Sequence, residues 1–285
     1  MAEAVLFEKQ VAVEHAPELY TVASSAAPLR GLAAVADEQV ARYRRDGFLA
    51  VEGALSEQEV EDARAGLHDL IVGRNPEFKG VLFEAAAKEK LETLSETERE
   101  LAVRKVFNFI RFDPRLDLLA KKPELLAVAA KLMGGAEPEL FQDMALVKPP
   151  KIGREKPWHQ DCAYFNYPVG TAVVGVWIAL DEATVANGCM HVLSGGHREG
   201  PKIHFNRRDW QICDREMLGR QAVAVPLKPG GALFFDGLLP HGTPTNHSDQ
   251  RRRALQFHYA PANVSKMKTE ERLAIYGSEG KDVSC

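Results

Sequence analysis

The chain has 285 residues, of which 45% are hydrophobic and 27% are charged. A chain of this length buries roughly three-quarters of the surface that its unfolded form exposes, so a stable core is expected without disulfide bonds or structural metal ions. Its 36 Lys and Arg against 40 Asp and Glu give a net charge of −4. This balance argues against nucleic acid and an anionic membrane surface as partners.

The N-terminal sequence does not resemble a signal peptide. It has neither a basic region nor the long apolar region of a signal peptide. The longest apolar stretch, residues 171–180, is far shorter than the ~20 residues that span a bilayer. We therefore expect a soluble, cytoplasmic protein without a membrane partner.

The first third of the chain predicts an arm followed by helices. Residues 1–35 are rich in alanine without a clear period, and we interpret them as an N-terminal arm. A helix is expected over 37–45, followed by a short strand over 48–51. Ser56 and Glu59 form a capping-box pattern that predicts the start of another helix. The apolar face of that helix would consist of Val60, Ala63, Leu67 and Leu70.

Two further helical segments are expected before residue 136. Residues 84–105 are strong helix formers with mixed charge and predict a solvated helical surface. Pro123 suits the first turn of a helix, and Gly134-Gly135 would end it.

After residue 135 the pattern changes to short β-rich runs separated by Gly, Pro and Asn. Helices first and many short strands afterwards favour an α+β, mainly β fold with a sheet sandwich or barrel. We expect one domain over 36–265, the arm at 1–35 and a C-terminal tail at 266–285. The β-rich runs are 140–147, 172–180, 222–227, 232–235 and 254–259.

A His-x-Asp tripeptide carries the first chemical signal. Side chains alternate in a strand, so His159 and Asp161 would point to one side and Gln160 to the other. An imidazole and a carboxylate on one side make up two-thirds of a facial triad. A second histidine would complete the triad and leave positions open, which is the arrangement that suits non-haem Fe(II).

His241 and Arg252 supply the missing parts of the pattern. His241 lies at the exit of a predicted buried strand, and Arg252 begins the last strand run. A metal with open positions needs a co-substrate, and a guanidinium is the natural partner of the far carboxylate of a dicarboxylate. We expect the competing histidines His197 and His204 to lie at the rim or surface. His258 shares the strand face of Arg252 and is interpreted as a residue behind the site or in the core.

These residues resemble the phytanoyl-CoA dioxygenase family of Fe(II)/2-oxoglutarate oxygenases. The resemblance covers roughly residues 37–262 and is specific to the family, although it says little about the substrate. The further motifs that carry it are Arg45-Asp46-Gly47-Phe48, Glu52-Gly53-Ala54-Leu55-Ser56, Trp177-Ile178-Ala179-Leu180-Asp181, Asn187-Gly188-Cys189-Met190 and Ser194-Gly195-Gly196-His197.

The resemblance implies a double-stranded β-helix, or jelly roll, of cupin type with N-terminal and flanking helices. It implies that His159, Asp161 and His241 form the catalytic centre by binding Fe(II), and that Arg252 binds the C5 carboxylate of 2-oxoglutarate. Members of the family use O2 to oxidise a C–H bond, usually by hydroxylation, and release succinate and CO2. The other co-substrate residues that it implies are Thr243, Trp177 and Met144.

The partner expected from this chemistry is a small-molecule substrate. Tyr164 and Phe165 follow the His-x-Asp tripeptide and would line its pocket, and Lys105 would bind an anionic group. Lys148 stands beside two prolines and is expected to be exposed. Related halogenases replace the acidic metal ligand with a small residue, so the presence of Asp161 argues against halogenation.

Two other functions are open at this point. A metal-dependent cupin-type enzyme that does not use 2-oxoglutarate would keep the three ligands and give Arg252 no special role. A non-enzymatic jelly-roll binding module would keep the fold without turnover.

Overall fold

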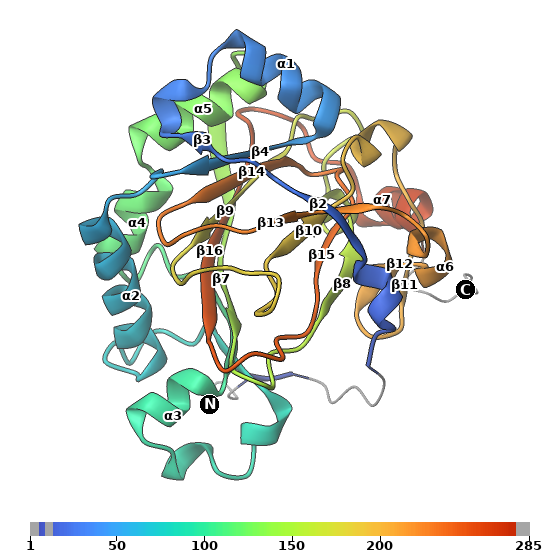
Figure 1. Cartoon of the computed structure of the whole chain (residues 1–285). Coiled ribbons are helices and arrows are strands. Elements are labelled where there is room, and N and C mark those ends of the chain that lie inside the picture. Colours follow the sequence, from blue (N-terminus) through green and yellow to red (C-terminus); the bar gives the residue numbers. More distant parts are fainter. Residues whose placement is uncertain (1–5, 9–13, 278–285) are drawn as a thin grey trace.

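The computed structural model describes residues 6–8 and 14–277 of the chain (Figure 1). The longer helices precede residue 135, and most strands follow it. The α-helices are α1 (Asp37–Asp46), α2 (Glu57–Ile71), α3 (Glu96–Leu101), α4 (Pro114–Ala120), α5 (Pro123–Leu132), α6 (Asp214–Met217) and α7 (Thr269–Tyr276). The strands are β1 (Leu6–Phe7), β2 (Val22–Ser25), β3 (Leu29–Arg30), β4 (Phe48–Glu52), β5 (Val81–Phe83), β6 (Val103–Phe107), β7 (Pro138–Lys148), β8 (Lys156–His159), β9 (Val174–Ala179), β10 (Met190–Val192), β11 (His204–Asn206), β12 (Trp210–Ile212), β13 (Ala222–Val225), β14 (Ala232–Asp236), β15 (His241–Thr243) and β16 (Arg252–Pro261).

Two mostly antiparallel sheets face each other and make up the centre of the molecule. The larger sheet has nine strands in the order β1-β5-β6-β7-β16-β9-β14-β4-β3, and the smaller has five in the order β2-β13-β10-β15-β8. The longest pairing joins β16 to β7, with Arg252 opposite Lys148 at one end and Pro261 opposite Pro138 at the other. This is the layered, mainly β architecture that the sequence predicted.

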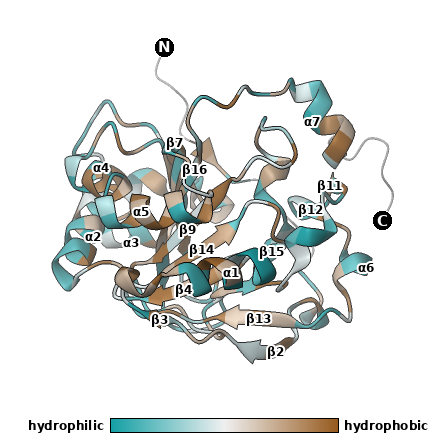
Figure 2. Ribbon diagram, turned by 90° about the horizontal axis from the view of Figure 1, so that it is seen from above, coloured by the Kyte–Doolittle hydropathy of each residue, from teal (hydrophilic) through white to brown (hydrophobic). Residues whose placement is uncertain are grey.

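Hydrophobic residues fill two layers of this architecture. One cluster lies between the nine-stranded sheet and the helices beside it, and includes Leu67 of α2, Leu116 of α4 and Phe257 of β16. The other lies between the sheets and includes Trp177 of β9 and Val225 of β13. In Figure 2 the central strands β4 and β14 are largely brown, whereas α1 on the outside is largely teal. Burial of this apolar surface is the main force that holds the sheets and helices together.

Local signals placed several elements correctly. The Ser56 side chain accepts a hydrogen bond from the Glu59 backbone, and the Glu59 carboxylate accepts one from the Ser56 backbone at 2.8 Å. The predicted apolar face of α2 is buried. Helix α1 ends at Gly47, whose φ of 83° suits glycine. The five predicted β-rich runs correspond to β7, β9, β13, β14 and β16.

The prediction of a helical surface over 84–105 is wrong for most of this segment, of which only Glu96–Leu101 forms an α-helix. This segment holds two short 3-10 turns and only then α3, whose N-cap is Ser95. Its last residues belong to β6, which pairs with β5 and β7. Val103 and Val106 are buried in the large core cluster, so the gain from burying them in a sheet outweighs the helix propensity of the preceding residues.

The N-terminal arm is part of both sheets where it is described. Strand β2 pairs in parallel with β13 of the smaller sheet, and β3 pairs in parallel with β4 of the larger one. These two strands, and β1 at the opposite end of the larger sheet, lie at sheet ends, so they cover edges that would otherwise expose unpaired backbone groups. The rest of the predicted arm (1–5 and 9–13) and the end of the predicted tail (278–285) lie outside the described residues.

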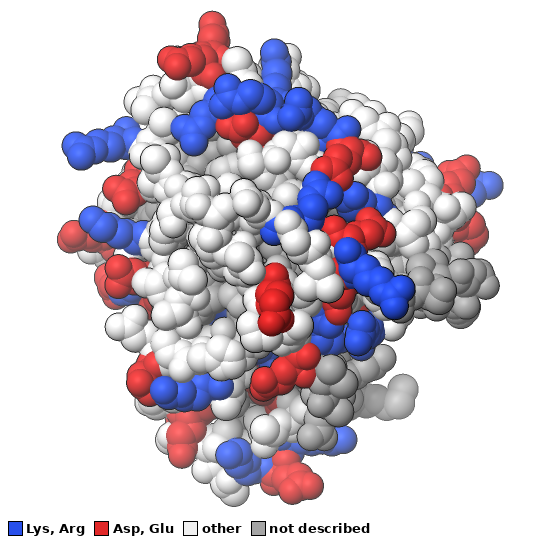
Figure 3. Space-filling model, turned by 45° about the vertical axis from the view of Figure 1, so that its right-hand side comes forward, with Lys and Arg blue, Asp and Glu red and all other residues white. Residues whose placement is uncertain are grey.

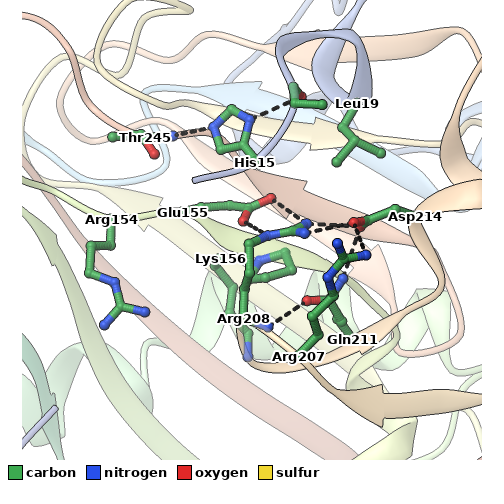
Figure 4. A network of polar contacts seen from close by, with 12 residues as sticks. His15, Leu19, Arg154, Glu155, Lys156, Arg207, Arg208, Gln211, Asp214 and Thr245 are labelled. Atoms are coloured by element: carbon green, nitrogen blue, oxygen red, sulfur yellow. Dashed lines mark hydrogen bonds and ion pairs between the residues drawn. The ribbon is translucent and has the colours of Figure 1, made fainter. Parts of the chain in front are cut away.

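A buried polar network fixes the arm against β8 (Figure 4). The Tyr20 hydroxyl donates to Glu155 at 2.7 Å, and the Arg208 guanidinium donates to the same carboxylate at 2.6 Å. Arg208 also donates two hydrogen bonds to Asp214, at 2.6 and 2.8 Å. Arg208 and Glu155 are both almost fully buried. Glu155 directly precedes β8, so this network holds the arm and that strand together.

Charged side chains of both signs intermingle over the face shown in Figure 3. No helix in the described part of the chain is long and apolar enough to cross a membrane.

Removing Arg208 tests the importance of this network. The substitution Arg208→Met would remove the buried cation that binds both Glu155 and Asp214, and breaking a buried ion pair in this way costs about 3–5 kcal/mol. We expect a loss of that size in the free energy of unfolding, measured with denaturant. The neighbouring Arg207 is half exposed and contacts Asp214 at 3.3 Å, so Arg207→Met should cost less than about 1 kcal/mol. Equal small effects of the two substitutions would contradict this account.

Candidate metal centre

Three side chains from two paired strands and a following turn converge inside the molecule. His159 is the last residue of β8, and His241 is the first residue of β15. The two strands are antiparallel with these histidines directly opposite each other, and their ring centroids lie 4.2 Å apart. Asp161 completes the group: one potential ligand atom from each residue lies within 4.8 Å of the other two.

Backbone carbonyls orient both imidazoles toward Asp161. Nδ1 of His159 lies 2.8 Å from the carbonyl oxygen of Pro157, and Nδ1 of His241 lies 2.8 Å from that of Leu239. A carbonyl only accepts, so each Nδ1 carries the proton and each Nε2 is left as an acceptor. The two Nε2 atoms lie 3.3 and 3.6 Å from the same oxygen, Oδ1 of Asp161.

Burial keeps these groups in the protonation state that a metal ion requires. It lowers the pKa of His159 to about 4 and also lowers the pKa of His241. Burial alone would raise the pKa of Asp161, but the nearby histidines hold it well below its usual range. Two neutral imidazoles and a carboxylate form the ligand set of non-haem Fe(II) oxygenases, so the donors fit iron.

The local backbone at Asp161 differs from the strand that the tripeptide predicted. Strand β8 ends at His159, and Asp161 begins a short 3-10 helix, Asp161–Ala163. The expected division of side chains still holds. Gln160 points away from the site, where its amide donates to the carbonyls of Gly200 and Leu238.

The triad opens into a cavity between the two sheets. The predicted substrate residues Tyr164, Phe165 and Lys105 line this cavity together with the triad. Trp177 lies under the guanidinium of Arg252, which is 5.3 Å from the centroid of its ring. The predicted co-substrate residues that line the cavity directly are Met144, Thr243 and Arg252.

Arg252 is buried with almost no polar partner. Its side chain is 1% exposed, its one hydrogen bond is a long contact of 3.4 Å to the carbonyl of Leu146, and its Nε has no partner among the described residues. Burial lowers its pKa to about 9. A buried cation without partners is costly unless an anion comes to it. This environment therefore favours a carboxylate ligand at Arg252.

Two sequence-based expectations need correction, and one residue must be added to the site. Lys148 is buried, not exposed. Its backbone lies opposite that of Arg252 in the ladder between β7 and β16, and its ammonium donates to the carbonyl of Pro244 at 2.7 Å. His204 is fully buried, not at the surface, and its Nε2 accepts from the backbone of Gln160 at 3.0 Å. Gln256 was not singled out, although the alternation along β16 already placed it on the face of Arg252 and His258.

Comparison with known proteins identifies the family. Residues 43–254 match the phytanoyl-CoA dioxygenase (PhyH) family. The chain belongs to that family. Among its relatives, phytanoyl-CoA dioxygenase domain-containing protein 1 of Danio rerio is 26% identical over 260 residues, which cover 78% of this chain and 89% of the relative. The peroxisomal phytanoyl-CoA dioxygenase of Bos taurus is 26% identical over 245 residues, covering 82% of this chain and 71% of the relative.

Solved structures agree with this phytanoyl-CoA dioxygenase assignment. EvdO2 from Micromonospora carbonacea var. aurantiaca, solved with 2-oxoglutarate, is 28% identical with a TM-score of 0.62 and covers 85% of this chain and 97% of its own. The epimerase SnoN, solved with Fe3+, alpha ketoglutarate and nogalamycin RO, is 22% identical with a TM-score of 0.66 and covers 82% and 86%. The jelly-roll fold and the class of Fe(II)/2-oxoglutarate-dependent enzyme are thereby confirmed at the level of the family.

Proton release on metal binding tests the lowered histidine pKa values. At about pH 6.5 an ordinary histidine is half protonated, so two of them would release about one proton per metal ion. Here burial lowers the pKa of both imidazoles, that of His159 to about 4, so fewer protons remain to be released at this pH. Calorimetric titration with Mn(II) in buffers of different ionisation enthalpy should show clearly less than one proton released per ion. Release of about one proton per ion would show that the histidines titrate normally.

Proposed function

We propose that this chain hydroxylates an aliphatic C–H bond of a small or medium-sized organic substrate, using Fe(II), 2-oxoglutarate and O2 and releasing succinate and CO2. The observation that carries the proposal is the combination of the triad with a buried arginine in the same cavity, whose guanidinium makes only one long hydrogen bond among the described residues. A triad alone would equally suit a cupin-type enzyme without 2-oxoglutarate. Arg252 is what favours a dicarboxylate co-substrate.

Each part of the site has a defined task in this proposal. His159, Asp161 and His241 hold the metal from one side, which leaves its remaining positions open to the co-substrate and O2. Bound iron, 2-oxoglutarate and O2 together supply the oxidising chemistry. Arg252 binds the C5 carboxylate, and Trp177 packs against the guanidinium face and keeps it in place. Thr243 follows His241 by two residues on β15, so its side chain lies on the same face and can reach the co-substrate.

Lys105 adds a second cation for anionic ligands. Its ammonium lines the cavity without a polar partner among the described residues, and burial together with Lys156 lowers its pKa to about 8. Lys156, by contrast, already donates to Asp209 at 2.7 Å and to Tyr164 at 2.8 Å. Lys105 is therefore the cation that is available to a carboxylate or other anionic group of a ligand in the cavity.

Tyr164 and Phe165 are proposed to contact the substrate. The Tyr164 hydroxyl is held by Lys156 and donates to the carbonyl of Trp210 at 2.7 Å, which fixes its ring edge-on to His159. The ring of Phe165 packs against Phe141 and His258. Two fixed aromatic rings beside the metal ligands form an apolar wall, which suits a substrate that presents an aliphatic C–H bond. The epimerase SnoN, whose fold is similar, was solved in complex with nogalamycin RO.

Two substitutions should abolish activity by different routes. With Fe(II), 2-oxoglutarate and O2, the wild-type protein should form succinate slowly even without its substrate. His159→Ala should lose the metal. Arg252→Ala should retain it but bind 2-oxoglutarate at least about 30-fold more weakly, the equivalent of about 2 kcal/mol. Both affinities are measured by calorimetry with Mn(II) under anaerobic conditions.

The nearby Arg251 provides the matched control for this experiment. It is partly exposed and pairs with Glu100 at 3.0 Å, so Arg251→Ala should leave both affinities unchanged. Metal-dependent activity that is unaltered in Arg252→Ala would favour the cupin-type alternative. Absence of both metal and 2-oxoglutarate binding in the wild type would overturn the proposal.

The charge of Lys105 should make ligand binding depend on pH. Because Lys105 loses its proton as the pH rises through about 8, the affinity of the metal-loaded wild type for 2-oxoglutarate should fall several-fold over that range. Lys105→Met should bind weakly at every pH in the range. Lys105→Arg, whose charge persists above pH ~12, should bind tightly throughout. An identical pH dependence in all three proteins would show that Lys105 does not act on anions in the cavity.

A further inference from the structure

The two oxygens of the Asp161 carboxylate have different partners. Oδ1 is the oxygen that faces Nε2 of His159 and of His241. Oδ2 points the other way and lies 2.7 Å from Nε2 of His258 and 3.3 Å from Nε2 of Gln256. One oxygen is thus directed to the metal position and the other to two protein groups on β16.

The proton on His258 is assigned by its partners. The Asp161 carboxylate only accepts, so Nε2 of His258 carries a proton and donates it. The Gln256 amide nitrogen lies 3.1 Å from the same Nε2, and both donors converge on Oδ2. Nδ1 of His258 is buried without a hydrogen-bond partner among the described residues. The carboxylate is therefore the anchor of this imidazole.

Aromatic rings hold His258 in this orientation. Its ring centroid lies 4.9 Å from that of Phe165, 6.0 Å from that of Phe141 and 6.3 Å from that of Phe235. His258 is 1% exposed. A hydrogen bond to a charged group in such a dry, apolar setting is stronger than one in water, and its geometry is fixed by packing.

We infer that His258, assisted by Gln256, is a positioning residue that restricts Asp161 to binding the metal through Oδ1 alone. Without this bond the carboxylate could turn and chelate the metal with both oxygens. That would occupy a position that the co-substrate or O2 needs. The inference rests on the proposed function, because it concerns how the same triad holds its metal.

The first test compares the metal-free and the Co(II)-loaded forms of the wild-type protein. Infrared difference spectra with 13C-labelled aspartate report whether a carboxylate binds through one oxygen or two. We expect the wide splitting of the carboxylate stretches that marks binding through one oxygen. The narrow splitting of a chelating carboxylate would overturn the inference without requiring any variant to fold.

The second test uses variants that keep or remove the donor. His258→Phe fits the aromatic surroundings but donates nothing, so the Co(II) affinity should fall by roughly 10- to 100-fold, as is typical when such an outer partner is lost, and the visible Co(II) spectrum should shift. His258→Gln carries an amide donor and should restore most of the affinity and the wild-type spectrum.

A buried histidine that does not line the cavity serves as the control. His191 is fully buried, and its Nδ1 contacts the carbonyl of Cys189 at 3.1 Å. His191→Phe should change neither the Co(II) affinity nor the spectrum. Wild-type binding in His258→Phe, or no recovery in His258→Gln, would contradict the inference. Failure of the wild type to bind Co(II) at all would instead count against the proposed function.

Discussion

The site depends on the antiparallel pairing of β8 with β15. This pairing brings His159 and His241, which are far apart in the sequence, directly opposite each other. The N-terminal arm supports the pair from the outer side: Tyr20 stacks on Trp158, whose indole donates to the carbonyl of Leu19 at 2.8 Å. A Cβ atom at Gly242 would lie 3.1 Å from the Tyr20 hydroxyl, closer than an ordinary contact, so the close approach of the arm favours glycine there. The arm is thus part of the support of the metal ligands.

The second constraint is the burial of positive charge around one carboxylate. The cavity wall holds five cationic side chains but only one acidic one, Asp161. Lys148 and Arg104 donate hydrogen bonds to backbone carbonyls, and Lys156 donates hydrogen bonds to Asp209 and Tyr164. Arg252 and Lys105 are left without comparable partners among the described residues. A dry cavity with these two cations is suited to small anions and disfavours neutral ligands, since only an anion offsets the cost of their desolvation.

The parts of this account that the sequence predicts are those encoded in short patterns or in distinctive chemistry. The helix that begins after Ser56 follows from its capping box. The expected triad follows from the His-x-Asp tripeptide together with the resemblance of the His, Asp, His and Arg set to a known family. The burial of Lys148 beside Arg252 depends on the register between β7 and β16, and no local pattern encodes that register. The same holds for β6 and for the pairing of the arm, because each is stabilised by strands distant in the chain. Long-range pairing therefore limits what the sequence predicts here.

The most direct test of the central claim is a crystal structure of the protein loaded with Mn(II) and 2-oxoglutarate in the absence of O2. We expect one metal ion bound by Nε2 of His159, Nε2 of His241 and a single oxygen of Asp161. We also expect that one carboxylate of 2-oxoglutarate contacts the metal and that the other contacts the guanidinium of Arg252. A metal ion bound elsewhere, or a co-substrate whose far carboxylate lies away from Arg252, would contradict the central claim.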